Sequence, residues 1–274
     1  MRDESNAAQR QLEFAHVSSK IKSLQTERSF RDSQKLFFAE GIRNFVHAFD
    51  YRYPIDTIIY SEKLLISPLA RKLVRKLKRD GTPFARVTPE QFREVSQTER
   101  ASGIAVICHQ QILEINRIKP KSHICWTALH TIRSPGNLGT LIRTSAAVGA
   151  GGFIIIGNQI DPFDPNIVRA TMGALFKQAI VRTTEKQFYD WVKTRNLQVM
   201  GASPNGATDY DKVSYQSPTI LMLGNERFGL TANQESFCGE LVRIPMVEGT
   251  DSLNVAVAGS LLLYEVFRSS VARE

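Results

Sequence analysis

Hydrophobic and polar positions alternate along this chain in two rhythms, one typical of short buried strands and the other of amphipathic helices. In the first 120 residues, apolar side chains at 37–50 recur with the spacing of a helix. The segments that follow predict a strand at 55–61, a strand, turn and helix at 82–95, and a strand at 103–110. This mixture favours an α/β unit of about 100 residues.

A helix with a strongly basic surface is predicted between Ser67 and Gly81. Ser67 is placed to cap it, the proline that follows suits a first helical turn, and Gly81 ends it. Leu69, Leu73 and Leu77 recur every four residues, so we expect them to form its apolar stripe. The rest of the helix surface carries six cations, namely Arg71, Lys72, Arg75, Lys76, Lys78 and Arg79.

Beyond the Lys119-Pro120 break, the alternation of strands and helices resumes and predicts a three-layer α/β domain with a largely parallel sheet. Strands are expected at 123–130, 153–158, 179–183, 197–203, 219–225 and 241–246, and helices from about 138, at 165–173 and at 254–268. From these patterns we predict a flexible tail at 1–15, an α/β domain at 16–115, a linker at 116–121 and a second domain at 122–274.

The distribution of charge adds a first indication of function. Of the 274 residues, 42% are hydrophobic and 23% are charged, which excludes a disordered chain. The formal net charge of +8 lies entirely in residues 1–121, which hold 22 Lys or Arg and 14 Asp or Glu. A localised positive surface favours a polyanionic partner, RNA or DNA. A basic helix face that meets only solvent is the alternative.

Composition also bears on the compartment. No apolar run approaches the about 20 residues that span a membrane, so no membrane partner is expected. The N-terminal segment is polar, and the three cysteines (Cys108, Cys125 and Cys238) are widely spaced. These features predict a cytoplasmic protein without a disulfide framework.

Candidate chemistry lies in the second half, where three polar or glycine-containing loops at 133–157, 221–234 and 244–268 join strands to helices. Open α/β sheets bind ligands where their strands end. The glycines at 149–152 do not predict a dinucleotide loop, because they follow a helix and precede a strand. The histidines show no metal-ligand spacing, and the two prolines of 161–165 mark a turn, so no metal site is expected.

Three segments in this half resemble, in order and separation, the motifs of the SpoU (TrmH-like) branch of the SPOUT methyltransferases. They are RSPGNLGTLIRTSAAVGAGG, LGNERFGL and the pair IPM and DSLNVAVA. The first 120 residues resemble, more generally, the small ribosomal-protein-like RNA-binding domain often fused ahead of such a catalytic domain. The resemblance implies 2′-O-methylation of ribose in structured RNA with S-adenosylmethionine, a trefoil knot in the second domain and a homodimer.

The same resemblance implies roles for individual positions. Gly224, Ile244 and Leu253 are expected to line the cofactor pocket, and the polar active-site positions fall on Asn137, Arg143, Glu226, Ser252 and Asn254. Asn225 and Phe228 depart from the small residue and the glycine or arginine that other members often carry.

Arg143 has two possible roles: removal of the ribose proton, or electrostatic stabilisation of the forming alkoxide, which suits a guanidinium better. We expect Asn137 and Glu226 to hold the loops and the arginine, and Ser252 and Asn254 to orient the ribose and the arginine. Structural alternatives stay open. Asn137 or Ser252 would also suit a helix cap, Glu226 a helix N-terminus, and Arg143 the surface of an amphipathic helix.

The sequence therefore predicts an RNA ribose 2′-O-methyltransferase whose basic first domain grips RNA, with ribosomal RNA favoured over transfer RNA. A transfer-RNA methyltransferase and a non-catalytic RNA-binding or assembly factor are the alternatives. A nicotinamide-dependent enzyme lacks a correctly placed glycine motif.

Overall fold

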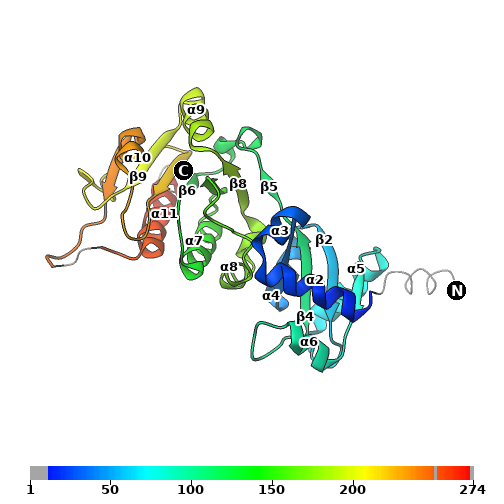
Figure 1. Cartoon of the computed structure of the whole chain (residues 1–274). Helices are drawn as coiled ribbons and strands as arrows, with labels where there is room; N and C mark the ends of the chain where they lie inside the picture. The colour runs from blue at the N-terminus through cyan, green and yellow to red at the C-terminus, as the bar shows by residue number, and fades with distance from the viewer. Residues whose placement is uncertain (1–11, 250–251, 272–274) are drawn as a thin grey trace. The chain divides into compact units, whose positions relative to one another are not determined.

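The computed structural model describes residues 12–249 and 252–271, and the chain divides into two compact units (Figure 1). The first unit contains the chain up to Gln110 together with Phe163–Lys177, and the second contains Gln111–Pro162 and the chain from Gln178 onward. Most of the predicted tail, residues 1–11, lies outside the described residues. The remainder of that prediction is wrong at its end, because a helix begins at Phe14.

The first unit is built on a four-stranded mixed sheet in the order β1-β4-β2-β3. Its strands are β1 (Leu36–Glu40), β2 (Ile55–Tyr60), β3 (Phe84–Arg86) and β4 (Ile104–His109). β4 runs antiparallel to both β1 and β2, whereas β2 and β3 are parallel. The strands predicted at 55–61 and 103–110 are thus confirmed.

Helices cover both faces of this sheet. α2 (Phe14–Thr26) and α6 (Pro89–Val95) bury apolar side chains on one face, with α3 (Arg28–Gln34) following α2. α4 (Ile42–Asp50) and α5 (Pro68–Arg79) pack together and belong to the other face. The helix predicted across 37–50 begins only at Ile42, because Leu36–Glu40 forms a strand whose side chains are buried on both faces of the sheet. Fully buried strands lack the alternation of apolar and polar side chains that identifies a strand. The apolar run at 37–40 is therefore included in the predicted helix.

α5 has the predicted ends but a different buried stripe. Ser67 Oγ accepts a hydrogen bond from the Ala70 amide, and the chain turns at Gly81 with a positive φ of 96°. Ala70, Leu73 and Val74 are buried, whereas Leu69 is 53% exposed. The stripe therefore follows i, i+3 and i+4 spacing, and the expectation that Leu69 is part of it is wrong.

The second unit is built on an eight-stranded sheet in the order β10-β12-β9-β11-β6-β7-β8-β5, with every neighbouring pair parallel. This confirms the predicted parallel sheet. The strands are β5 (Ile112–Leu113), β6 (Cys125–Leu129), β7 (Gly152–Ile156), β8 (Ala179–Thr183), β9 (Gln198–Ala202), β10 (Thr208–Asp209), β11 (Thr219–Leu223) and β12 (Glu240–Arg243).

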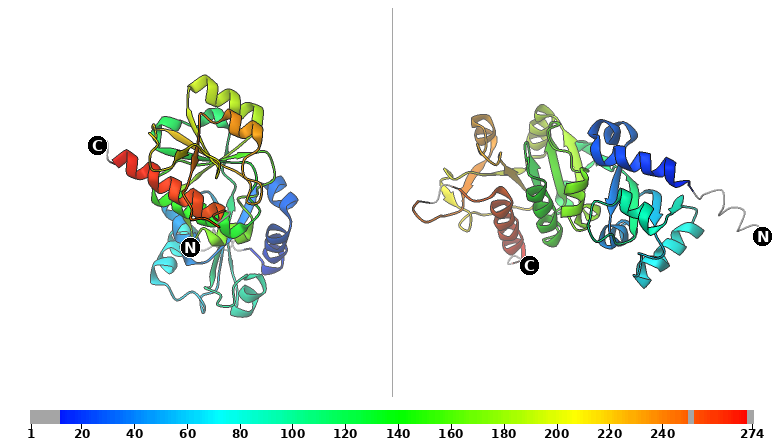
Figure 2. Two further views of the ribbon diagram at one scale, coloured as in Figure 1. Left: turned by 90° about the vertical axis from the view of Figure 1, so that its left-hand side faces the viewer. Right: turned by 60° about the horizontal axis from the view of Figure 1, so that its bottom comes forward.

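Helices lie on both faces of this sheet (Figure 2). α9 (Glu185–Arg195) and α10 (Ala232–Phe237) cover one face, and α7 (Pro135–Ala147) and α11 (Val255–Val271) lie together on the other. Gly259 of α11 approaches α7 so closely that an added Cβ would lie 2.6 Å from Leu141 Cδ2. Gly259 thus allows α11 to pack closely against α7.

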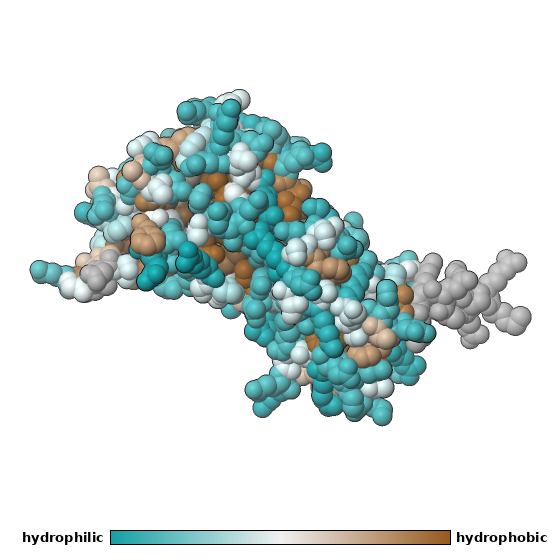
Figure 3. Space-filling model, in the orientation of Figure 1, coloured by the Kyte–Doolittle hydropathy of each residue, from teal (hydrophilic) through white to brown (hydrophobic). Residues whose placement is uncertain are grey.

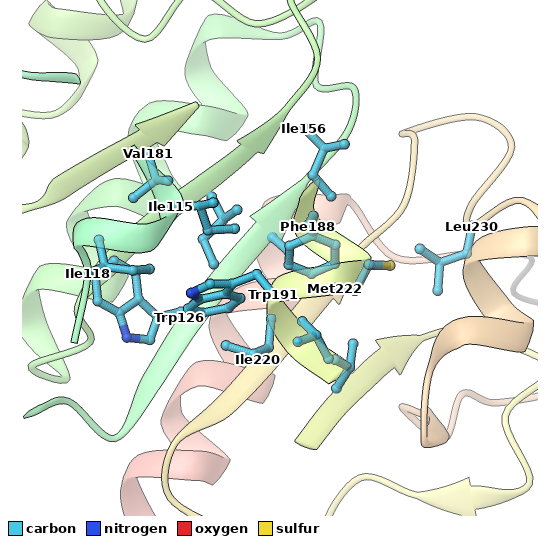
Figure 4. Close-up of a cluster of buried hydrophobic side chains, with 14 residues drawn as sticks. Ile115, Ile118, Trp126, Ile156, Val181, Phe188, Trp191, Ile220, Met222 and Leu230 are labelled. Carbon is cyan, nitrogen blue, oxygen red and sulfur yellow. The ribbon is translucent and has the colours of Figure 1, made fainter. Parts of the chain in front are cut away.

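The core between the sheet and α9 is aromatic and aliphatic (Figure 4). Phe188 and Trp191 of α9 pack with Trp126 of β6 and Ile220 of β11. Ile115 and Ile118 belong to the same cluster and are almost fully buried. They lie in or beside two short 3₁₀ turns, η1 (Ile115–Arg117) and η2 (Pro120–Ser122).

The division of the chain differs from the predicted boundaries. The predicted linker at 116–121 is part of the second unit, since Ile118 is buried in its core and β5, just before it, pairs with β8. Conversely, α8 (Pro165–Ala170) and η3 (Ala174–Lys177) pack in the first unit, where Phe163 lies 4.8 Å from the Phe37 ring.

No helix in the described ranges is long and apolar enough to cross a membrane. The molecular face shown in Figure 3 is largely hydrophilic.

Candidate active site

A cavity of about 510 Å³ lies in the second unit, where the adjacent parallel strands β12, β9 and β11 end. Its walls come from the loops after these strands and from α10 and the first turns of α11. Carboxyl ends of parallel strands are where open α/β sheets bind ligands, and the volume is typical of a small-molecule site.

The predicted cofactor residues converge on this cavity. Gly224, Ile244 and Leu253, which are up to 29 positions apart in the sequence, all line it. Gly224 is required for the shape of the wall, because an added Cβ would lie 2.1 Å from the Gly229 carbonyl carbon. Any larger residue would force the segments at 224 and 229 apart.

The cavity combines an apolar wall with a few polar groups. Leu223, Leu230 and Leu262 contribute apolar surface, while Glu235 and Ser203 add polar atoms. Ser203 Oγ donates to Glu235 Oε1 at 2.9 Å, which fixes the carboxylate at the wall. This donor set fits an amphipathic, positively charged ligand that has an aromatic base, hydroxyls and an ammonium group.

Glu226 joins two loops beside the cavity. Its carboxylate accepts hydrogen bonds from the backbone amides of Arg133 and Ser134, both at 3.2 Å, and from the Asn137 side chain. The predicted loop-holding role of Glu226 and Asn137 thus has a geometric basis. The carboxylate also lies at the N-terminus of α7, where a negative charge is favoured.

Asn254 extends this network to the start of α11. Its Nδ2 donates to Asn137 Oδ1 at 3.0 Å, and its Oδ1 accepts from the Ala256 amide at 2.8 Å. Asn254 therefore caps α11 with one end of its amide and holds Asn137 with the other. Ser252 lines the cavity instead of capping the helix.

Asn137 is not the cap of α7, because Ser134 Oγ accepts from the Asn137 amide and begins the helix. Asn137 is the third residue of α7, and Arg143 follows six residues later. Six residues rotate the helix so that these side chains point roughly 120° apart, about 9 Å along the axis. This separation explains why the structure does not bring them together.

Arg143 is exposed, and within the described ranges no hydrogen bond or ion pair connects it to Asn137, Glu226 or Asn254. The predicted holding and orienting of Arg143 by these residues has no counterpart in the structure. The guanidinium is available to an external partner.

The thiols of this unit are not nucleophiles. Burial, together with the nearby Glu235 carboxylate, raises the pKa of Cys238 to about 12, and burial raises that of Cys125 to about 12. At neutral pH both thiols are protonated, so the chemistry of the cavity does not run through a thiolate. Among the described residues there is no group of His, Cys, Asp and Glu that could hold a metal ion.

One wall of the cavity contains none of the residues predicted from the sequence. Ser203 and Asn205 follow β9, and Glu235 lies on α10. The signal was present, because the polar turn Ser203–Gly206 directly follows a predicted strand of a parallel sheet. Without the strand order, nothing indicated that β9 lies between β12 and β11.

The basic residues of α5 belong to the first unit. Five of the six predicted RNA-binding cations are exposed, and Lys78 is half-buried. Lys78 Nζ lies 4.0 Å above the Phe84 ring and donates to Tyr60, while Arg71 donates to the Leu65 and Glu62 carbonyls. These two cations support the local structure. In the described chain, no partner is recorded for Lys72, Arg75 or Arg79.

Comparisons with known proteins agree with the motifs and the fold. Residues 126–264 match the SpoU rRNA Methylase family, and residues 19–106 match the MRM3-like substrate binding domain. A 23S rRNA (uridine(2479)-2′-O)-methyltransferase from Streptomyces viridochromogenes is 29% identical over 243 residues, 86% of this chain and 84% of that protein.

Two crystal structures extend the similarity to nearly the whole chain. An AdoMet-bound rRNA methyltransferase from Sinorhizobium meliloti is 31% identical, with a TM-score of 0.84 over 92% of this chain and 94% of that one. The SpoU methyltransferase AviRb from Streptomyces viridochromogenes, in complex with AdoMet, is 27% identical, with a TM-score of 0.83 over 93% and 98%. The chain, with its parallel sheet and its strand-end cavity, belongs to the SpoU rRNA methylase family and carries an MRM3-like substrate-binding domain ahead of the catalytic one.

Proposed function

We propose that this protein transfers a methyl group from S-adenosylmethionine to a ribose 2′-hydroxyl of ribosomal RNA. The observation that carries the proposal is the convergence of Gly224, Ile244 and Leu253 on one cavity, beside the Glu226–Asn137–Asn254 network. The relatives whose names include rRNA methyltransferase, and those solved with AdoMet, support the same activity and cofactor.

The residues of the cavity divide the binding of the cofactor between them. Ile244, Leu253 and Leu230 suit the adenine ring, while Glu235 and backbone groups near Gly224 suit hydroxyl and ammonium donors. When bound, S-adenosylmethionine supplies an already activated methyl group. The chain's own task is therefore to align the ribose oxygen and to assist loss of its proton.

When bound, S-adenosylmethionine would supply the methyl group to the 2′-oxygen, its bond to sulfur breaking with the electron pair left on sulfur, and the hydroxyl proton would pass to water. Arg143 stabilises the developing negative charge on that oxygen from an exposed position on α7. Asn137 and Asn254 hold the start of α7 and the start of α11 together.

The substrate-binding role falls to the first unit. Lys72, Arg75 and Arg79 of α5 present positive charge to solvent and would neutralise RNA phosphates. Ribosomal RNA is favoured over transfer RNA because relatives that match most of this chain are named as rRNA methyltransferases. A trefoil knot around the cavity and a cytoplasmic location remain predictions, the latter consistent with three free cysteines.

A homodimer is part of the proposal and has support on α11. Val257, Leu261, Tyr264 and Phe267 are between 39% and 53% exposed and recur along one side of the helix. An exposed apolar stripe of this kind is typical of a subunit contact. Sedimentation at micromolar concentration is expected to give a dimer mass, and a monomer would contradict it.

Methyl transfer from labelled S-adenosylmethionine to unmodified rRNA and tRNA transcripts tests the proposed activity. We expect label in rRNA, at a nucleotide that mass spectrometry identifies as 2′-O-methylated. Label in tRNA alone would support the transfer-RNA alternative. An absence of cofactor binding by calorimetry up to millimolar concentration would support a non-catalytic RNA-binding factor.

A further inference from the structure

The loop at the rim of the cavity is a short, fixed hairpin. Asn225 and Gly229 exchange backbone hydrogen bonds of 2.8 and 3.0 Å, and Gly229 adopts a φ of +67°. Asn225 Oδ1 also accepts from the amides of Arg227 and Phe228, at 2.8 and 3.3 Å. The three residues at the tip are thus held by their own backbone, so their side chains project from a defined position.

Phe228 at this tip is the most exposed large hydrophobic residue in the described ranges, at 83%. No ring or cation contact is recorded for it there, although it lies at the wall of the cavity. A solvent-exposed aromatic ring that is held in a fixed position beside a binding site is typical of a surface that contacts an external ligand.

Two arginines come from the segments next to this tip. Arg227 precedes Phe228 on the hairpin, and Arg133 lies on the neighbouring loop, which Glu226 holds against the hairpin through the Arg133 amide at 3.2 Å. Both arginine side chains are exposed, and within the described part of the chain no hydrogen bond or ion pair engages them. The hairpin and the loop that Glu226 holds against it therefore present one exposed aromatic ring and, within the described ranges, two unpaired positive charges.

This combination favours a nucleic acid over other occupants. Arginines bind phosphates, and a ring left in solvent can stack on an unpaired base, which is how proteins usually recognise single-stranded RNA segments. A second copy of the chain has its own apolar surface along α11, which carries no comparable pair of arginines. The adenine of the cofactor would be covered by the cavity wall and would not call for two arginines.

From this geometry we propose that Phe228 stacks on an RNA base next to the methylated ribose, while Arg227 and Arg133 bind the adjoining phosphates. The inference rests on the proposed function and assigns the second unit its own RNA contact, separate from the basic face of α5. Phe228 is a substrate-positioning residue and makes no contact with the reacting atoms.

Substitutions at position 228 separate stacking from simple apolar contact. Phe228→Ala and Phe228→Leu remove the π-face, whereas Phe228→Trp keeps it, and the high exposure leaves folding unaffected by all three. Each variant is measured for affinity to an in vitro rRNA transcript, for methyl transfer to that transcript, and for S-adenosylmethionine affinity without RNA. Val247→Ala, at an 80% exposed apolar residue of the same unit, is the matched control.

We expect the Ala and Leu variants to lose RNA affinity and to raise KM for RNA by about 5- to 150-fold, the range of one stacked base. The Trp variant and Val247→Ala are expected to stay within about 2-fold of wild type, with cofactor affinity unchanged throughout. Replacing Arg227 or Arg133 with Gln should each reduce the salt slope of RNA binding by about 0.7.

Three results would overturn the inference: a Leu variant that binds RNA as the wild type does, a Trp variant as weak as Ala, or a parallel loss of cofactor affinity. The last would identify Phe228 as a cover for the cofactor. Failure of the wild type to methylate rRNA would instead reject the proposed function, and the binding series would still decide whether Phe228 stacks.

Discussion

The basic face of α5 and the polar network around Glu226 use their charged groups in opposite ways. On α5, Lys72, Arg75 and Arg79 point into solvent without recorded partners in the described chain. In the network, one carboxylate accepts from two backbone amides and an amide side chain. The first arrangement is suited to attracting a polyanion, and the second to holding atoms in fixed positions.

The difference has an energetic consequence. Exposed cations contribute a long-range attraction that is screened by salt. The strength of this attraction depends little on where each side chain points. The network contributes little attraction but fixes three chain segments, at 133–137, 226 and 254. We therefore expect substitutions in the two regions to affect different measurements.

The largest effect is expected at Arg143. In the proposed mechanism, the Arg143 guanidinium stabilises the negative charge that develops on the ribose oxygen. Arg143→Ala should therefore lower kcat by about 10²- to 10³-fold, with cofactor affinity unchanged. Arg195→Ala is a control for loss of an arginine, since that side chain packs over Trp191 on the opposite face of the sheet. A wild-type kcat for Arg143→Ala would exclude the residue from the mechanism.

Arg143→Lys distinguishes the two roles that remain open for this residue. A lysine has an ordinary pKa near 10.4, so as a base it would give a rate that rises with pH up to about that value. As a fixed cation it would give partial activity that is flat between about pH 7 and 9. A pH–rate profile of the variant makes the decision.

A smaller effect is expected for Gly224→Ala. The added Cβ would overlap the backbone at Gly229, and relieving that overlap costs about 1–3 kcal/mol. If the overlap destabilises the conformation of the cavity that binds the cofactor, the affinity for S-adenosylmethionine should fall by about 5- to 150-fold. Calorimetry measures this affinity. RNA affinity through α5 should not change, and a joint loss would contradict the separation between the two regions.

Removal of the free cations of α5 should have a graded effect. The triple change of Lys72, Arg75 and Arg79 to Gln is expected to lower the slope of RNA affinity against salt by about 2, because each phosphate contact contributes about 0.7. Cofactor affinity and thermal stability should stay at wild-type values. An unchanged slope in filter binding would move the RNA-binding surface elsewhere.

The smallest effect is expected for a cation of the same unit that is paired. Lys20 Nζ lies 2.9 Å from Asp56 Oδ2. Burial acts to raise the pKa of Asp56, but the hydrogen bonds from Lys20 and Thr57 outweigh it, so the net pKa is lowered. A lowered folded-state pKa stabilises the protein above the unfolded value of about 3.9, and this contribution is lost as the pH falls through the folded pKa.

Lys20→Met should therefore cost about 0.2–1 kcal/mol of unfolding free energy at pH 7, and less below about pH 3. Urea unfolding at both pH values provides the measurement. Lys72→Met, at an unpaired cation, is the matched control and should leave the unfolding free energy unchanged. A cost that does not depend on pH would mean that the lysine acts through packing.

The elements of the fold were largely predictable from local pattern. The cap at Ser67 and the strand at 219–225 are decided by residues within a few positions of each other. The failures lie where burial overrides pattern. β1 is buried on both sides and loses its alternation, and Ile118 looks like linker although it fills the core.

The candidate site was predictable only as a set of residues. The motifs pointed to Gly224, Ile244 and Leu253, which do line one cavity. The part played by β9 depends on strand order, which no local signal encodes. The separation of Asn137 from Arg143 follows from helical rotation and could have been derived once the start of α7 was fixed at Ser134.

The order of these segments in the chain has a consequence for synthesis of the protein. Ser252, Leu253, Val255, Ala258 and Leu262 complete the cavity, and Asn254 closes the hydrogen-bonded network. A nascent chain that still holds these late residues in the ribosomal tunnel has already released the residues of the first unit, but its cavity is incomplete. If the first unit binds RNA as proposed, the protein would associate with RNA during translation before it could modify it.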